Sequence, residues 1–330
     1  MVGGKKKENG EIGMRVGQNP AKFVKEVPQP ERITVAVLNY IPFVSGFYVN
    51  LPEVLDTCLK QLRATADLPF DLMVFDNGSC PEVRNYLTKQ RDEGMIQYLI
   101  LSEKNLGKGG AWNMIFAAAP GEILVYTDND CLFYNGWLSE SLKLLETFPN
   151  VGMVTARPFR TNPEFYTASV AWAEQDDDTK LERGHFIPYE VFQEFDLSLG
   201  QSEEEIRSHY ENSEDVRLTY RGVEGMLGAS HWQFMAYKSV LQQFLPFQMD
   251  RPMGQVKRLD ERMNQAGYLR LMPVKPYAMN MSNTLRAVQP QAKGEVKKAS
   301  SVKYKILDFP LLQKILLFFY NRIFQWYYDR

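Results

Sequence analysis

Short apolar runs alternate with segments of helical periodicity over residues 32–130, and this alternation constrains the fold more than any other feature. The apolar runs cover residues 33–38, 70–75, 96–100 and 121–127, and helical spacing fills residues 51–62, 82–91 and 105–119 between them. Parallel strands need crossover connections, which are usually helices, so this order predicts a parallel sheet with helices on both faces. We therefore expect an α/β fold.

The rest of the chain carries weaker signals. Residues 162–220 are polar and acidic without clear periodicity, which predicts short helices and long loops. We expect two short strands within residues 225–236, a helix over 255–266 that ends at Gly267, and a last strand over 268–272. Residues 289–305 have the composition of a basic linker, and residues 309–328 have the pattern of an apolar, aromatic helix.

The composition is that of an ordinary globular protein. Of the 330 residues, 45% are hydrophobic and 24% are charged, with a net charge of −2, so no nucleic-acid partner is expected. The 3 cysteines form no CxxC pair and histidine is scarce, which argues against structural zinc and favours a reducing compartment. We expect a cytoplasmic protein without a signal peptide, because residues 1–11 contain no apolar stretch, and without a membrane-spanning helix.

Two carboxylates stand one residue apart where the fourth apolar run ends, in the tripeptide Asp128-Asn129-Asp130 (the DND). Hard divalent cations such as Mg2+ and Mn2+ take oxygen ligands of this kind and often bridge them to phosphates. In open α/β sheets, ligands bind beyond the carboxyl ends of the strands, which is where this tripeptide falls. The alternative interpretation is an acidic turn, since Asp and Asn are common turn residues.

Polar residues follow the other three apolar runs in the same way. They are Asn39-Tyr40, Asp76-Asn77-Gly78-Ser79 and Asn105-Leu106-Gly107-Lys108. The carboxyl ends of parallel strands meet at one edge of the sheet, so we expect these segments to converge on the DND. Taken singly, Asp76 is also compatible with a helix N-cap or turn, and Lys108 with a solvated loop.

In this order the motifs resemble those of the family 2 glycosyltransferases, which have the GT-A fold. The resemblance includes Gly136-Trp137-Leu138 after the DND, and Arg262 followed by Gly267-Tyr268 at the end of a helix. It covers residues 32–152 well and residues 225–283 more loosely. It implies a mostly parallel central sheet flanked by helices. It further implies a Rossmann-like nucleotide-sugar-binding half (32–152) and an acceptor-binding half (153–288). Composition and pattern add a partly disordered leader (1–31) and a basic linker with an amphipathic C-terminal helix (289–330).

The resemblance also implies a site for a UDP- or GDP-linked sugar donor at this edge. Asp76 would bind the base or ribose, and Lys108 would meet a phosphate or the base. The residues implied in nucleotide-sugar binding are Asn39, Tyr40, Asp76, Asn105, Gly107, Lys108, Asp128 and Asn129. Mn2+ or Mg2+ would be bound by Asp128, Asp130 and Asn280, the last standing where many relatives have a histidine. The metal would stabilise the leaving diphosphate.

An inverting transferase also needs a general base for the acceptor hydroxyl. Relatives usually carry a Glu-Asp pair before the helix that ends in Gly-Tyr, but the corresponding positions here are Gln255 and Val256. We expect Asp260 to be the base, with Asp250 and Glu261 as alternatives. A solvated acid on a helix surface is the simpler interpretation of Glu261.

His231 and Trp232 correspond to the acceptor side of the cleft in relatives. Trp232 would stack on a sugar ring, and His231 would contact an acceptor hydroxyl or phosphate. Packing in the core is the competing interpretation for both side chains.

The sequence thus predicts a metal-dependent glycosyltransferase that moves a sugar from a nucleotide-diphosphate sugar to a hydroxyl of a carbohydrate or glycolipid, with inversion. A retaining GT-A transferase, and a sugar-nucleotide-binding protein without transferase activity, stay open as alternatives. A sugar-nucleotidyltransferase is disfavoured, because the first strand is not followed by a Gly-rich, Arg-bearing loop. The C-terminal helix is expected to dock on the catalytic domain or form a homodimer, with peripheral membrane contact as the alternative.

Overall fold

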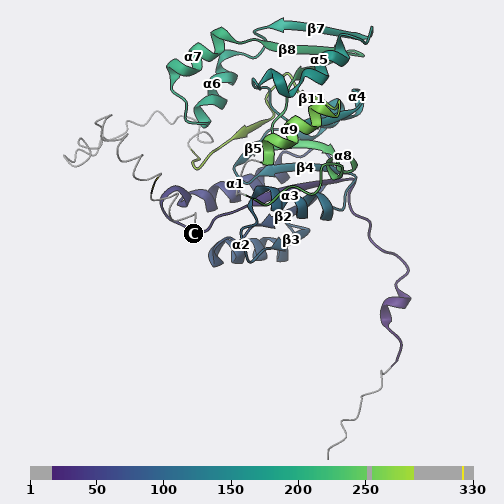
Figure 1. Cartoon of the computed structure of the whole chain (residues 1–330). Coiled ribbons are helices and arrows are strands. Elements are labelled where there is room, and N and C mark those ends of the chain that lie inside the picture. Colours follow the sequence, from purple (N-terminus) through teal and green to yellow (C-terminus); the bar gives the residue numbers. More distant parts are fainter. Residues whose placement is uncertain (1–16, 251–254, 286–321, 323–330) are drawn as a thin grey trace, which may run out of the picture. The chain divides into compact units, whose positions relative to one another are not determined.

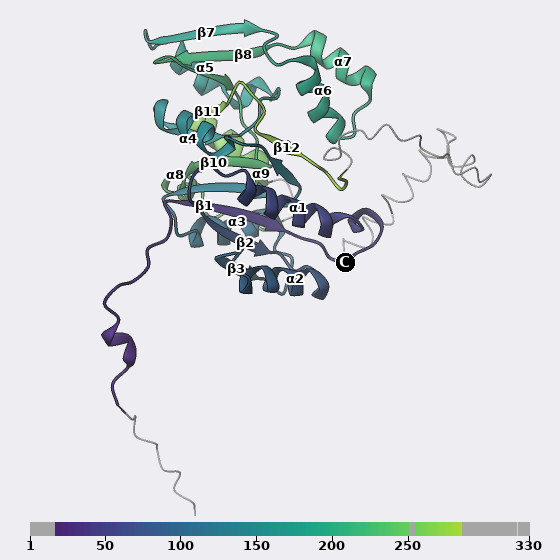
Figure 2. The ribbon, with the colours of Figure 1, turned by 180° about the vertical axis from the view of Figure 1, so that it is seen from behind.

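A ten-stranded sheet runs through the described part of the chain, in the order β3-β2-β1-β4-β10-β6-β11-β9-β8-β7 (Figure 1 and Figure 2). This computed structural model describes residues 17–250, 255–285 and 322. The strands of the sheet are β1 (Ile33–Asn39), β2 (Asp71–Asp76), β3 (Tyr98–Leu101), β4 (Ile123–Asp128), β6 (Val151–Val154), β7 (Thr179–Gly184), β8 (Asp215–Tyr220), β9 (Val223–Leu227), β10 (Gln233–Tyr237) and β11 (Leu269–Met272). A second sheet pairs β5 (Cys131–Phe133) with β12 (Ala278–Asn280).

The helices connect these strands and cover the sheet. They are α1 (Leu51–Ala64), α2 (Pro81–Asp92), α3 (Gly107–Ala118), α4 (Trp137–Thr147), α5 (Thr167–Ala173), α6 (Tyr189–Ser198), α7 (Glu203–Asn212), α8 (Lys238–Gln242) and α9 (Gln255–Gln265). Helix α9 ends before Gly267, whose φ of 78° is the left-handed conformation typical of a glycine just past a helix.

The alternation of apolar runs and helices produces the predicted parallel half of the sheet. Strand β1 pairs in parallel with β2 on one side and β4 on the other, and β2 pairs in parallel with β3. Following the pairings across the sheet, seven of its ten strands run in one direction, and β10, β9 and β7 run against them. The predicted α/β class with a mostly parallel sheet is therefore confirmed.

Helices pack on both faces, so the central strands are buried on both sides. The crossovers through α1 and α2 move along the sheet in one direction and the crossover through α3 returns, so right-handed connections put α3 on the opposite face. Tyr86 of α2 donates a hydrogen bond to Asp56 of α1. On the other face, Trp112 of α3 packs edge-on against Tyr126 of β4 and Phe234 of β10. Helices α8 and α9 extend this core.

The half after residue 152 is mixed and only partly predicted. Strand β10 lies antiparallel between β4 and β6, and β9, β8 and β7 form an antiparallel meander at the sheet edge. Helices α5, α6 and α7 agree with the expected short helices. The expectation of loops over residues 179–184 and 215–220 was wrong, because these residues form β7 and β8. Strand β7 has the sequence TKLERG and no buried residue, so it lacks the apolar face that marks a strand in sequence.

The chain divides into two units, Met1–Ala287 and Val288–Arg330. Both sheets and all the helices named above belong to the first unit. The predicted basic linker and C-terminal helix fall in the second unit, and apart from residue 322 they lie outside the described residues, as do residues 1–16 of the leader. No helix within the described ranges is long and apolar enough to cross a membrane.

Candidate active site

The carboxyl ends of three neighbouring strands bring the predicted motifs together. In the register of the sheet, Asn39 of β1 lies beside Asp76 of β2, and Leu38 of β1 lies beside Asp128 of β4. The polar residues that follow each apolar run therefore meet at one edge, as parallel strands require. This convergence was predicted from the order of the motifs alone.

Four side chains at this edge form a hydrogen-bonded network that we call the amide cluster: Asn39, Asp76, Ser79 and Asn129. The Asn39 amide nitrogen donates to Asp76 Oδ1 at 2.8 Å and to Ser79 Oγ at 3.0 Å. Asn129 donates to Asn39 Oδ1 at 2.7 Å. The other Asp76 oxygen accepts from the Ser79 backbone N–H at 3.1 Å. Asp76 is fully buried. Because its two oxygens bond to Asn39 at the end of β1 and to Ser79 after β2, it holds the turns after these strands together.

A second set of amides fixes the loop that begins α3. Asn77 accepts a hydrogen bond from the Leu106 backbone N–H at 2.8 Å and donates to Asn105 at 2.9 Å. Asn105 in turn accepts from the Gly107 N–H at 2.8 Å. Gly78 has a φ of 88°, and a Cβ there would lie 3.0 Å from the Asn105 backbone nitrogen. The two loops thus pack backbone to backbone, which explains why glycine occupies this position.

Lys108 and Asp128 form an ion pair at the rim of the site. The Lys108 Nζ lies 2.8 Å from Asp128 Oδ2, with both side chains largely shielded from solvent. The same ammonium group lies over the rings of Trp112 and Tyr126, at 5.7 and 5.4 Å from their centroids. The Tyr126 hydroxyl donates to the other Asp128 oxygen. Asp128 is therefore held by two neighbours.

Asp130 differs from Asp128 in its surroundings. It is half-buried, and Asn280 lies beside it because β12 pairs with β5 so that Asn280 is opposite Cys131. Burial and the charge of Asp128 raise the pKa of Asp130 to about 7, while Lys108 and a hydrogen bond from Asn280 act to lower it. A buried carboxyl group with a strongly raised pKa beside a second carboxylate is a candidate functional group.

The oxygen atoms at the DND fit a hard divalent cation whose coordination shell is completed by a bound ligand. Two carboxylates and an amide oxygen are suitable oxygen ligands for such a cation. The raised pKa of Asp130, caused by burial and then by the charge of Asp128, agrees with a site where a cation would favour the ionised carboxylate. Asn280 Oδ1 already accepts from the Ser282 N–H at 2.6 Å. Among the described residues, no group of three or more His, Cys, Asp or Glu side chains could hold a metal. A cation bound here would take further oxygens from phosphate or water.

On the other side of β4, three charged or titratable side chains form what we call the Arg–Asp–His chain: Arg270, Asp260 and His231. Arg270 of β11 is fully buried, and its Nη2 lies 2.5 Å from Asp260 Oδ1. The other Asp260 oxygen lies 3.4 Å from His231 Nδ1. Arg270 also donates to the carbonyls of Ala229 and Phe165. Burial lowers the pKa of Arg270, and the charge of Asp260 opposes this shift.

The three acids predicted as bases differ in their surroundings. Asp260 is 4% exposed, and Arg270 and His231 occupy its two oxygens. Asp250 is exposed and pairs with Arg258 at 3.8 Å, and Glu261 is partly exposed and pairs with Lys257 at 3.6 Å. Glu261 thus agrees with the simpler interpretation of a solvated helix acid.

The two predicted acceptor-side residues also differ. Trp232 is 7% exposed, and its ring packs at 5.8 Å from Phe195 and 6.4 Å from Phe159. These neighbours favour a packing role over the predicted stacking on a sugar. His231 has a side chain 36% exposed. Its neighbour Trp232 accepts a hydrogen bond from the Asp128 N–H at 2.9 Å, so the turn that carries His231 adjoins the DND.

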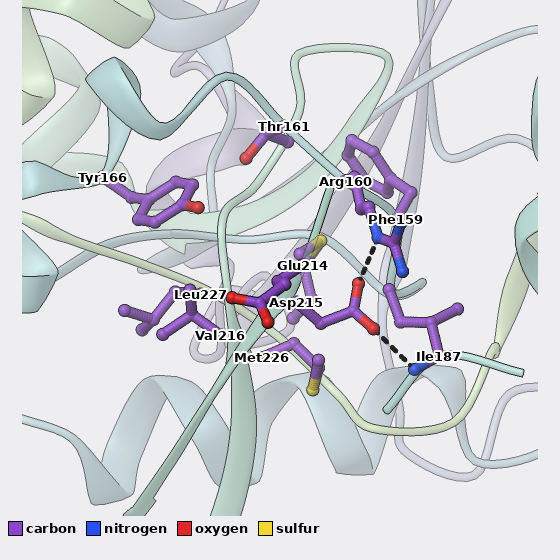
Figure 3. Close-up of a pocket in the computed structure, with 11 residues that line it drawn as sticks. Phe159, Arg160, Thr161, Tyr166, Ile187, Glu214, Asp215, Val216, Met226 and Leu227 are labelled. Atoms are coloured by element: carbon purple, nitrogen blue, oxygen red, sulfur yellow. Dashed lines mark hydrogen bonds and ion pairs between the residues drawn. The ribbon is translucent and has the colours of Figure 1, made fainter. Parts of the chain in front are cut away.

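Two hollows in the described part of the chain differ greatly in size. One, of about 300 Å³, is lined by Gly46, Phe47, Val49, Asn50, Asn283 and Thr284, on the segments that follow β1 and β12. Tyr40 lies on the same segment after β1, edge-on to Tyr48. The other, shown in Figure 3, has a volume of only about 10 Å³ and surrounds the buried ion pair of Arg160 and Asp215. It holds at most a water molecule, so it is not a sugar site.

Two neighbours of the candidate site residues were not singled out from the sequence. Tyr126 precedes Asp128 by two residues on one strand, so the alternation of a strand puts both side chains on the same face. That spacing was a usable signal. Arg270 stands in the middle of an apolar run, and a charged residue in such a run needs a buried partner. The sequence could indicate the need for a partner but not that Asp260 is that partner.

Comparison with known proteins agrees with the motif series. Residues 43–194 match the family model described as "Glycosyl transferase family 2". Over 123 residues, the chain is 24% identical to an uncharacterized glycosyltransferase from Nostoc sp. (strain PCC 7120). This alignment covers 37% of the chain and 35% of the relative. The resemblance to a family 2-like glycosyltransferase is therefore confirmed. The family match includes Asp76 and the DND but ends before the Arg–Asp–His chain.

Solved structures with similar folds include a mannosyltransferase and S. aureus TarS. One is mannosyltransferase PcManGT from Pyrobaculum calidifontis in complex with GDP-Man and Mn2+, with a TM-score of 0.45, 18% identity, and coverage of 74% of this chain and 55% of that one. The other is S. aureus TarS 1–349, with a TM-score of 0.45, 13% identity, and coverage of 76% and 60%. The chain thus spans about a third of the curated relative and somewhat over half of each structure. Because these TM-scores are below 0.5, the fold assignment rests on the chain's own sheet topology.

Proposed function

We propose that the chain is a metal-dependent glycosyltransferase that uses a UDP- or GDP-linked sugar as donor and a hydroxyl of a carbohydrate or glycolipid as acceptor. The observation that carries the proposal is the position of Asp128 and Asp130, one residue apart, at the carboxyl edge of the sheet and within the residues that match the family. The raised pKa of Asp130 supports a bound cation at this point. The donor half is residues 32–152 and the acceptor half residues 153–288.

Asp128 and Asp130, with Asn280, would hold Mn2+ or Mg2+, which would neutralise the negative charge that develops on the leaving diphosphate. Lys108 provides a second positive charge beside Asp128 for a phosphate oxygen. Both oxygens of Asp76 are bonded within the protein, so Asp76 also holds the end of β1 against the turn after β2. Its contact with the base or ribose stays a prediction. The turns after β1 and β2, with Tyr40, shape the pocket for the nucleoside.

Inversion at the anomeric carbon is part of the proposal. A single displacement needs only one base, on the side from which the acceptor approaches. The Arg–Asp–His chain lies across β4 from the amide cluster and supports an acceptor on that side. The anomeric configuration of the product, read by NMR, would distinguish this from a retaining transferase.

The test is cleavage of nucleotide sugars by the purified chain with Mn2+. UDP-glucose, UDP-GlcNAc and GDP-mannose are each incubated with the protein and a panel of sugar acceptors, and released nucleoside diphosphate is measured. We expect release from at least one donor, lost on chelation and in Asp130→Asn but kept in Asp177→Asn, which changes an acid outside the site. If no donor is cleaved, and none raises the melting temperature, the proposal is wrong.

One observation favours a second candidate, a nucleotide-sugar-binding protein without transferase activity: Gln255 and Val256 stand where relatives carry the acidic pair. It predicts stabilisation by a nucleotide sugar and Mn2+ without cleavage. A ligand at about 100 times its dissociation constant stabilises by about 2.7 kcal/mol, so a thermal shift would detect this case.

A further inference from the structure

His231 combines three properties that suit a general base. Its side chain is partly open to solvent, its turn adjoins the DND through the hydrogen bond from Asp128 N–H to the Trp232 carbonyl, and its Nδ1 faces the Asp260 carboxylate. With Nδ1 directed at Asp260, the other ring nitrogen, Nε2, has no hydrogen-bond partner among the described residues.

Asp260 and Arg270 hold this imidazole in place. Asp260 is almost completely buried, so its carboxylate cannot itself meet an acceptor hydroxyl. Arg270 binds Asp260 at 2.5 Å and is anchored by the carbonyls of Ala229 and Phe165, so the carboxylate has a fixed orientation toward His231. A carboxylate on one ring nitrogen orients the imidazole and stabilises the imidazolium that forms when the other takes a proton. The separation of 3.4 Å is long, as is common before substrate binds.

We propose that His231 is the general base for the acceptor and that Asp260 is its positioning residue. This rests on the proposed glycosyltransferase function and revises the role expected for Asp260. His231 Nε2 takes the proton of the acceptor hydroxyl as the acceptor oxygen bonds to the anomeric carbon. The bond from that carbon to the diphosphate breaks, and the diphosphate leaves with the electron pair. The partly exposed imidazolium then returns its proton to solvent.

The other candidates on the acceptor side lack one or more of these properties. Asp250 and Glu261 pair with cations at the surface. His185 faces Arg160, and His209 faces Asp196 between α6 and α7. The distance from the imidazole Nδ1 to the carboxylate oxygen is nearly the same in the two pairs, 3.3 Å for His209 and 3.4 Å for His231. The His209 pair, however, lies between α6 and α7 and not beside the strand ends that form the site. His209 is therefore a matched control.

The test compares an acceptor that carries a proton with one that does not. The full chain with Mn2+ and the donor it cleaves is given water or a sugar hydroxyl as acceptor, or azide, which attacks the anomeric carbon without losing a proton. In His231→Asn, we expect a loss of about 10²-fold or more in kcat with water or hydroxyl, with the KM of the donor unchanged. Azide-dependent formation of glycosyl azide should stay near wild type. His209→Asn should behave as wild type with both acceptors.

Asp260→Asn should show the same selective loss, smaller than that of His231→Asn, if it folds. Should it fail to fold, the His231 variants decide, because that side chain is partly exposed. Added imidazole should restore part of the hydroxyl-dependent activity of His231→Ala. Equal loss with water and azide, or activity within about threefold of wild type in His231→Asn, would overturn the base role. A wild-type chain that cleaves no donor would instead remove the proposed function and the base role with it.

Discussion

The amide cluster and the Arg–Asp–His chain flank the same DND, but they are built in opposite ways. The amide cluster joins one carboxylate to neutral side chains, all at the ends of the neighbouring parallel strands β1, β2 and β4. The Arg–Asp–His chain joins a buried cation to a buried anion and a histidine, from α9, β11 and the turn before β10. The first holds one buried carboxylate among neutral hydrogen-bonding groups, which suits a pocket that must keep its shape. The second pairs opposite charges beside an imidazole, which suits proton transfer.

The largest effect on activity is expected from a substitution in the DND, which lies between these two groups. Asp130→Asn keeps the shape of the side chain but removes the charge that a divalent cation needs. We expect kcat/KM for the donor to fall by about 10²- to 10³-fold, since a metal is worth several kcal/mol of transition-state stabilisation. Initial rates of nucleoside-diphosphate release measure this, with Asp177→Asn as the control. A fall of less than about threefold would mean that the DND is an acidic turn.

Removing the cation of the Arg–Asp–His chain should cost more stability than trimming the amide cluster. Arg270→Met leaves Asp260 buried without its partner, which typically costs about 3–5 kcal/mol, as breaking a buried ion pair does. Asn39→Ala leaves hydrogen-bonding groups unsatisfied and should cost about 1–3 kcal/mol. Urea denaturation gives both values. The double variant Arg270→Met/Asp260→Asn should regain part of the loss; if it does not, the pair is not the source of the cost.

The pH dependence of stability tests the electrostatic state of Asp130. Its pKa is raised to about 7 in the folded chain from an ordinary value of 3.8, so the folded state binds the proton more tightly than the unfolded state. The stabilisation from that proton is complete below 3.8 and is lost as the pH rises through about 7. Without metal, Asp130→Asn should therefore be more stable than wild type at about pH 8, by on the order of 1–4 kcal/mol. The difference should shrink toward about pH 4 and when Mn2+ is added. No difference on the alkaline side would contradict the raised pKa.

The smallest effect concerns the contact of the two loops beside the amide cluster. Gly78 and Gly94 have similar positive φ values, 88° and 80°, but of these two a Cβ meets backbone only at Gly78. Gly94→Ala should cost about 1 kcal/mol from the left-handed conformation alone. Gly78→Ala should cost about 1–2 kcal/mol more, because the Asn105 backbone has to move, and it should also weaken nucleotide binding. Equal effects in melting temperature would mean that the loops do not need their close contact.

The contrast between the two sides of the DND also explains what the sequence could predict. The parallel half of the sheet was predicted because its central strands are buried on both faces and are followed at once by their polar residues. Asn39, Asp76 and the DND could therefore be grouped from the sequence alone. The position of Asn280 beside Asp130 agrees with its predicted place near the metal, and metal binding itself stays a prediction.

The acceptor side was less accessible because tertiary contacts build it. Asp260 was selected for its place on a helix, but burial and the ion pair with Arg270 depend on β11, ten residues further along the chain. The contact with His231 spans 29 residues and joins a helix to a turn. No local sequence pattern predicts a contact between residues that are this far apart in the chain. Strand β7 was missed for a related reason, since an exposed edge strand needs no apolar alternation.

The central claim is that the DND binds a nucleotide diphosphate through a divalent cation. Isothermal titration of UDP and of GDP into the wild-type chain and Asp130→Asn, each with and without Mn2+, tests this most directly. We predict that at least one nucleotide binds wild type at least about 10-fold more tightly with Mn2+ than without it, and that Asp130→Asn loses this difference. Equal affinity of wild type and Asp130→Asn in the presence of Mn2+ would contradict the account.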